Sequence, residues 1–195
     1  IFPLLISIPY VFTIYNDIKS NYVYNITSRI DKSRYYLSKL LTQFIVGMAV
    51  VAFALISSFV LTAAILPLEH PTMASAEYNI SVTKAFPELF YNHTFVSAIV
   101  FIVLESVVFG IIGCIGFIFS YLLNNVIMVM LSSFIIYYMD FILSNLCGRY
   151  GSLMAASKIG ILHKAWVTGL VAELMIIAVT AVVVCIIRMN KKDLL

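Results

Sequence analysis

Four stretches of this chain are long and apolar enough to cross a membrane, namely residues 40–66, 95–123, 126–146 and 165–187. A membrane-spanning helix needs about 20 mostly apolar residues. Inside the hydrocarbon layer the chain must satisfy its own backbone N–H and C=O groups, so these runs have to be helical. The chain is 63% hydrophobic and only 11% charged, against about 25% charged in ordinary soluble domains. We therefore expect one all-α domain over residues 1–195, a polytopic membrane helix bundle.

Residues 1–15 form a fifth apolar run, which is shorter and contains Pro3 and Pro9. Proline is tolerated in membrane helices because neighbouring helices and side chains satisfy the carbonyls that it leaves free. We interpret this run as part of the second helix of a subunit whose first helix is missing. Five spans are then present in this chain, and the intact subunit has six.

The distribution of lysine and arginine predicts which loops face the cytoplasm. Five basic residues lie in 16–39 and three in the tail 188–195. Four spans separate these two segments, so both lie on one side of the membrane, together with the turn at 121–125. Only four basic residues remain for the other side. The positive-inside rule places the richer side, including the C-terminus, in the cytoplasm of a plasma-membrane protein. The loop 67–94 is then external, and 147–164 is external or re-entrant.

Residues 16–39, the polar segment, lie between two apolar runs. Apolar or aromatic residues recur there every four positions, at Ile18, Tyr22, Ile26 and Ile30. On a helix this spacing forms one stripe, with charged residues on the other faces. We therefore expect an amphipathic helix over Asn16–Ile30, either on the inner membrane surface or packed against a partner. We expect it to join the next spanning helix without interruption.

The start of that spanning helix also has recognisable signals. Asp31 or Ser33 can cap it, because a short side-chain oxygen accepts hydrogen bonds from the free N–H groups of the first turn. Tyr35 and Tyr36 then lie at the depth of the lipid headgroups. Lys39 can extend its ammonium group to the same interface.

The polar segment resembles the membrane subunit of type-2 ABC transporters. In that family an aspartate, an apolar stretch and a basic residue precede a further basic residue, a tyrosine and a lysine where the third helix begins. The matching positions here are Asp17, Arg29, Arg34, Tyr36 and Lys39. The order of helices also resembles that family, with a cytoplasmic coupling element between helices two and three and a membrane-dipping segment between helices five and six. The likeness is closest to the small permeases of Gram-positive bacteria.

The resemblance implies that this chain is the permease subunit of an ATP-driven exporter of a peptide, lipid or drug. Its partners would be separate ABC ATPase subunits, a second permease copy or a related permease, and membrane lipid, with no nucleic acid. ATP and magnesium would bind to the ATPase partner and no cofactor to this chain, which lacks the GxxxxGK[ST] phosphate loop and is not expected to be an enzyme. The residues expected to couple this chain to the ATPase are Asn16, Asp17, Lys19, Tyr22, Arg29, Arg34 and Lys39.

Three carboxylates lie within the apolar runs, at Glu105, Asp140 and Glu173. An ionisable group at membrane depth is costly and often functional, so these are candidates for a substrate path. They also support an alternative, an ion-coupled secondary transporter or channel. Hydrogen bonding between helices is the structural explanation for them. The three histidines are dispersed and predict no metal site.

Glycine recurs every three residues at Gly110, Gly113 and Gly116. Small residues at this spacing let another helix approach closely in a membrane. We therefore expect residues 110–116 to lie at a contact between helices.

Overall fold

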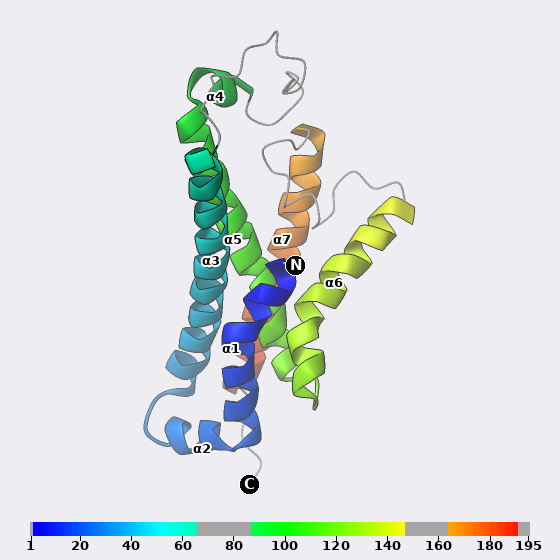
Figure 1. The fold of residues 1–195 in the computed structure, drawn as a ribbon. Coiled ribbons are helices and arrows are strands. Elements are labelled where there is room, and N and C mark those ends of the chain that lie inside the picture. The colour runs from blue at the N-terminus through cyan, green and yellow to red at the C-terminus, as the bar shows by residue number, and fades with distance from the viewer. Residues whose placement is uncertain (1, 66–86, 147–163, 191–195) are drawn as a thin grey trace.

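The computed structural model describes residues 2–65, 87–146 and 164–190, and the regular structure of these residues is entirely helical. The helices are α1 (Phe2–Lys19), α2 (Tyr22–Thr27), α3 (Lys32–Ile65), α4 (Pro87–Asn92), α5 (Thr94–Ser120), α6 (Val126–Leu146) and α7 (Lys164–Asn190). Figure 1 shows the long helices side by side in one elongated bundle. The expected all-α helix bundle is confirmed.

Four of the described helices are long and apolar enough to span a membrane: α3, α5, α6 and α7. The protein is therefore embedded in a membrane. Of the expected spans, 126–146 has the same limits as α6, and α5 and α7 differ from theirs by a few residues. The fifth expected run corresponds to α1, which continues past Tyr15 to Lys19 and ends in a polar turn.

The connections between the helices lie at two ends of the bundle. One end holds α2, the end of α1, the start of α3, the turn between α5 and α6, and the end of α7 (Figure 1). The opposite end holds α4, the end of α3 and the start of α7. The polar segment, the turn at 121–125 and the end of α7 thus share one end, as the number of helices between them predicts. Of the expected external segments 67–94 and 147–164, residues 67–86 and 147–163 lie outside the described residues, as does the tail after Asn190.

The polar segment is not the single helix expected over Asn16–Ile30. Its first four residues belong to α1, and the chain then turns at Asn21, whose φ is 57°. This left-handed conformation ends a helix, and asparagine is one of the residues that tolerates it. The short helix α2 follows and ends at Thr27. The prediction of one continuous amphipathic helix was therefore wrong.

The expected four-residue stripe is also only partly buried. Ile18 and Ile26 pack against an apolar cluster together with Val23. Tyr22 and Ile30 are about half exposed instead. The turn at Asn21 changes the direction of the chain, so residues before and after it do not continue one face.

The join between α2 and α3 is a short break rather than a continuous helix. The hydroxyls of Thr27 and Ser28 donate hydrogen bonds back to carbonyls of α2, and the Arg29 amide donates to the Ile26 carbonyl. Helix α3 then starts at Lys32, directly after Asp31, which was one of the two predicted capping residues. This start is eight residues earlier than the expected Leu40, so Tyr35, Tyr36 and Lys39 lie inside the helix.

Helix α5 is the centre of the bundle and contacts α1, α3, α6 and α7. Its glycines lie where the neighbouring helices approach. A Cβ atom added to Gly113 would lie 2.6 Å from Cγ2 of Ile6, and one added to Gly116 would lie 2.5 Å from Cγ2 of Val11. Both contacts come from α1. The glycines therefore let α1 pack directly on the backbone of α5.

A second close contact joins α3 to α5. A Cβ atom added to Gly47 would lie 3.3 Å from the Cα atom of Gly110 and 2.9 Å from Cγ2 of Ile6. The contact with Gly110 is to a backbone atom, so no rotamer change can relieve it and the two helices themselves would have to shift. Gly47 therefore sets the distance between α3 and α5.

We expect Gly47→Val to destabilise the folded protein by about 1–3 kcal/mol, because overpacking would force the two helices apart. The measurement is the midpoint of thermal unfolding in detergent. Ala49→Val is the matched control, since Ala49 lies on the exposed face of α3 and should change stability by less than about 0.5 kcal/mol. Equal midpoints for the two variants would contradict this account of α3–α5 packing.

Candidate functional site

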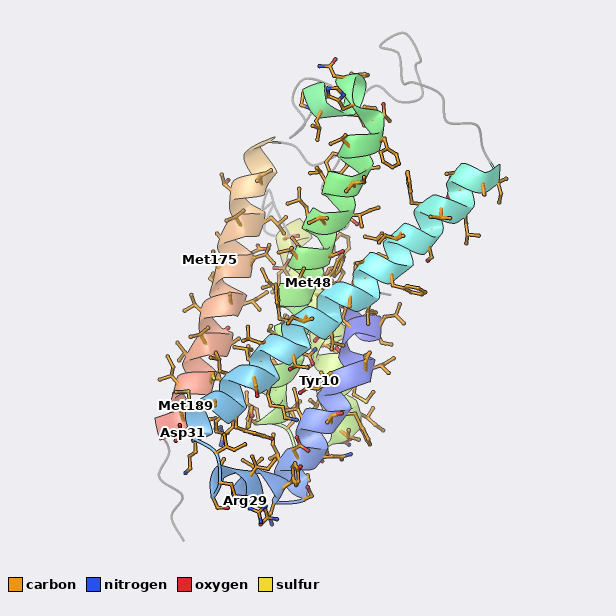
Figure 2. All side chains as sticks on the ribbon, turned by 90° about the vertical axis from the view of Figure 1, so that its left-hand side faces the viewer. Tyr10, Arg29, Asp31, Met48, Met175 and Met189 are labelled. Atoms are coloured by element: carbon orange, nitrogen blue, oxygen red, sulfur yellow. The ribbon has the colours of Figure 1, made fainter. Side chains whose placement is uncertain are left out.

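The most polar part of the described structure is the end of the bundle formed around α2. Figure 2 shows α2 lying across this end, with Arg29 extending beyond it. The described basic residues at this end are Lys19, Arg29, Lys32, Arg34, Lys39 and Arg188. Because the adjoining helices are apolar, the arrangement of these charges determines what the end can bind.

An ion pair between Asp17 and Lys39 joins α1 to α3. Oδ2 of Asp17 lies 2.5 Å from Nζ of Lys39, and the two side chains are only 15% and 16% exposed. A charge pair this well shielded is screened much less by water and salt than a surface pair. Removing one partner leaves the other charge partly buried and uncompensated, which is strongly destabilising. The pair therefore fastens the end of α1 to the first turns of α3.

Two tyrosines complete this ion pair. The hydroxyl of Tyr35 donates a hydrogen bond to Oδ2 of Asp17 at 3.2 Å. The ammonium nitrogen of Lys39 lies 5.3 Å from the centre of the Tyr10 ring and 5.6 Å from that of Tyr35. Aromatic faces attract cations at this distance. Asp17 and Lys39 are therefore both held by further groups from α1 and α3.

A second cluster at the same end joins α3 to α5 and α7. The ring of Tyr36 lies 6.0 Å from that of Tyr121, which follows the end of α5. The guanidinium carbon of Arg188 lies 4.9 Å from the centre of the Tyr121 ring, and its Nη2 donates a hydrogen bond to the Tyr121 carbonyl at 3.1 Å. Burial raises the pKa of the Tyr121 hydroxyl, so the ring stays neutral beside this cation. A movement of α3 at this end would therefore be transmitted to the end of α5 and to α7.

The remaining predicted coupling residues are on the surface. Asn16, Lys19, Tyr22, Arg29 and Arg34 are all exposed or about half exposed. Arg34 lies 3.7 Å from Asp31, but both side chains are more than three-quarters exposed, and such pairs contribute little to stability. The structure thus separates the predicted set into a shielded pair, Asp17 and Lys39, and exposed residues that remain accessible to a partner.

The three predicted path carboxylates lie on three different helices. Glu105 is on α5, Asp140 on α6 and Glu173 on α7, and each is partly buried. Among the described residues no three His, Cys, Asp or Glu side chains are grouped so that they could hold a metal ion. The carboxylates therefore do not form one shared site.

Two fully buried polar side chains that each have an atom without a partner among the described residues were not predicted from the sequence, Gln43 on α3 and Ser133 on α6. Nε2 of Gln43 donates a hydrogen bond to the Gly113 carbonyl at 3.2 Å, which fixes the orientation of the amide. Oε1 of Gln43 and Oγ of Ser133 have no hydrogen-bond partner among the described residues. Each is a polar residue inside an apolar run of the sequence. The sequence prediction considered only the ionisable residues of these runs.

No family model matches this chain, and no curated protein or solved structure is detectably similar to it. The resemblance of the polar segment to type-2 ABC permeases therefore stays a prediction.

We expect Asp17→Asn and Lys39→Met each to destabilise the protein by about 1.5–3 kcal/mol, the range for hydrogen bonds to charged groups. The double variant should lose less than the sum, because a single substitution already breaks the shared contact. Unfolding midpoints of the three variants in detergent measure this coupling. Asp31→Asn is the matched control, since it breaks the exposed pair and should leave the midpoint unchanged. Additive losses would contradict a direct pair.

Gln43→Leu should leave the unfolding midpoint unchanged or raise it. Leucine has a similar volume and removes a buried acceptor that has no partner among the described residues, which offsets the lost bond to Gly113. Gln43→Ala should lower stability by about 2–5 kcal/mol, because it leaves a cavity. If Gln43→Leu is as destabilising as Gln43→Ala, then Oε1 has a hydrogen-bond partner in the folded protein.

Proposed function

We propose that this protein is the permease subunit of an ATP-driven ABC exporter. The polar segment is the contact for a separate ATPase subunit, and the bundle forms part of the path for a hydrophobic or amphipathic substrate. The proposal starts from the resemblance of the residues between Asp17 and Lys39 to type-2 ABC permeases. An exporter of this kind needs a segment at one end of the bundle that can bind a partner and transmit its movement.

The shielded ion pair between Asp17 and Lys39 is the observation that carries the proposal. It connects the last turn of α1, which leads into α2, with the first turns of α3. Helix α3 is unbroken over 34 residues, a length of about 51 Å. A force applied to α2 and to the end of α1 would therefore reach α3 through this pair and reorient the helix as one rigid element.

The exposed residues of the polar segment support a contact with an ATPase subunit at this end of the bundle. Lys19 precedes α2 and Arg29 follows it, and both are exposed to solvent. Tyr22 adds a half-exposed aromatic ring at the start of α2. Arginine and tyrosine are enriched where protein partners bind. The surface around α2 thus combines two cations with an aromatic side chain.

The alternative, an ion-coupled transporter or channel, would use Glu105, Asp140 or Glu173. Among the described residues these carboxylates do not belong to any group of three or more acidic, histidine or cysteine side chains that could hold a metal ion. We therefore favour the permease.

The proposal predicts an ATP-binding subunit that co-purifies with this protein from its native membranes. Photolabelling with 8-azido-ATP would identify that subunit. The double variant Lys19→Glu and Arg29→Glu should retain at least tenfold less of it, since a tenfold loss corresponds to only about 1.4 kcal/mol of binding free energy. Its unfolding midpoint should match that of the unmodified protein, because both side chains are exposed.

Lys164→Glu is the control, because α7 begins at the opposite end of the bundle (Figure 1). It should retain the labelled subunit. If no ATP-labelled subunit co-purifies with the unmodified protein, the permease proposal fails. If the Lys19 and Arg29 variant retains the subunit fully, the contact does not lie around α2.

A further inference from the structure

Helix α3 has two sharply different faces in its first four turns. The buried residues Tyr36, Leu40, Gln43 and Gly47 follow one face and contact the bundle. Leu37, Leu41 and Ile45 follow the opposite face, and each is half exposed or more. In a membrane-embedded protein, large apolar side chains exposed at the helix surface contact lipid. The second face of α3 is therefore the lipid-facing one.

Arg34 lies on this lipid-facing side, one turn before Leu37. It is seven residues from Leu41, so the two side chains leave the helix within about 20° of each other. Arg34 is thus the first residue of the stripe that continues through Leu41 and Ile45. Its guanidinium group is turned away from the bundle, and its side chain is 81% exposed.

The depth of Arg34 matches that of the lipid headgroups. Helix α3 is about 51 Å long, whereas the hydrocarbon layer is about 30 Å thick. About 20 Å of α3 therefore lies outside that layer. The charged residues of α3, Lys32, Arg34 and Lys39, are all at the end that carries the polar segment, so this end lies at or beyond the edge of the layer. One turn separates Arg34 from Leu37, a distance of about 5 Å along the helix axis. An arginine at this position reaches the level of the lipid phosphates.

Arg34 is also free to bind such a group. Its contact with Asp31 is exposed and 3.7 Å long, so it is weak and easily exchanged. Lys39 differs in this respect, because it is shielded and held by Asp17. Arg29 differs in its position, because it lies after α2 and extends beyond the end of the bundle (Figure 2).

We propose that Arg34 and the stripe formed by Leu37, Leu41 and Ile45 are a binding site for an anionic phospholipid. The guanidinium group binds the lipid phosphate with its paired N–H donors, the geometry in which arginine recognises phosphate. The acyl chains lie along the three apolar side chains. This site is separate from the proposed ATPase contact, and it places Arg34 among the lipid contacts rather than the coupling residues expected from the sequence.

The test measures the unfolding midpoint of the detergent-purified full chain with added phosphatidylglycerol or phosphatidylcholine. Phosphatidylglycerol should raise the midpoint and phosphatidylcholine should not. Arg34→Gln should weaken the apparent affinity for phosphatidylglycerol about fivefold, the contribution of one cation near an anionic surface. Arg34→Lys should lose less, because it keeps the charge but not the paired donors.

Arg29→Gln is the matched control, since it removes the same charge from the same end of the bundle but from outside the lipid-facing stripe. It should keep the full response to phosphatidylglycerol. An equal loss for Arg29→Gln and Arg34→Gln would overturn the site and indicate diffuse attraction to the whole polar end. An unchanged response of Arg34→Gln would also overturn it.

Two further measurements separate this site from its alternatives. Inorganic phosphate at the same concentration should not raise the midpoint, and an equal rise would show that the acyl chains contribute nothing. Retention of the 8-azido-ATP-labelled subunit should be unaffected by Arg34→Gln. Loss of that subunit together with an intact lipid response would assign Arg34 to the protein partner and overturn the proposal.

Discussion

The close approach of α1 and α3 to the backbone of α5 is the constraint on which this bundle depends. Gly113 and Gly116 admit side chains of α1, and Gly47 and Gly110 bring α3 against α5. Association of helices in a membrane relies on such packing, because lipid tails are as apolar as the helices themselves. The positions of α1 and α3 relative to each other are thus determined in the interior, about one to three turns away from the polar segment.

This interior packing creates the site at the polar end. Asp17 and Lys39 are 22 residues apart and belong to different helices. Because α1 and α3 both pack on the glycines of α5, Oδ2 of Asp17 and Nζ of Lys39 lie 2.5 Å apart at the polar end. The tyrosines from the same two helices then surround the ammonium group of Lys39. The ion pair is therefore a consequence of how α1 and α3 pack on α5, and it makes the polar segment part of the bundle.

The sequence predicted the features that follow from local composition. Apolar length predicted α5, α6 and α7, and the glycine spacing predicted close packing at α5. The prediction of one helix over Asn16–Ile30 failed at Asn21, because a residue in the left-handed conformation interrupts a helix without altering the apolar pattern around it. The sequence could not predict that Asp17 contacts Lys39, or that Gln43 is buried beside Gly113. Those contacts depend on the relative rotation of helices, which a pattern along one helix does not contain.

The polar end separates its charges according to burial. Without Asp17, the shielded charge of Lys39 would destabilise the fold. The two side chains therefore stay paired with each other and are not available to bind a partner. An exposed charge such as Arg29 or Arg34 contributes little to the fold and is available for binding. Arg29 and Arg34 differ in their positions. Arg29 extends beyond the end of the bundle, whereas Arg34 is the first residue of an exposed apolar face of α3. A water-soluble partner can reach the first, whereas the second faces the lipid. The same kind of side chain can thus serve a protein contact and a membrane contact within five residues.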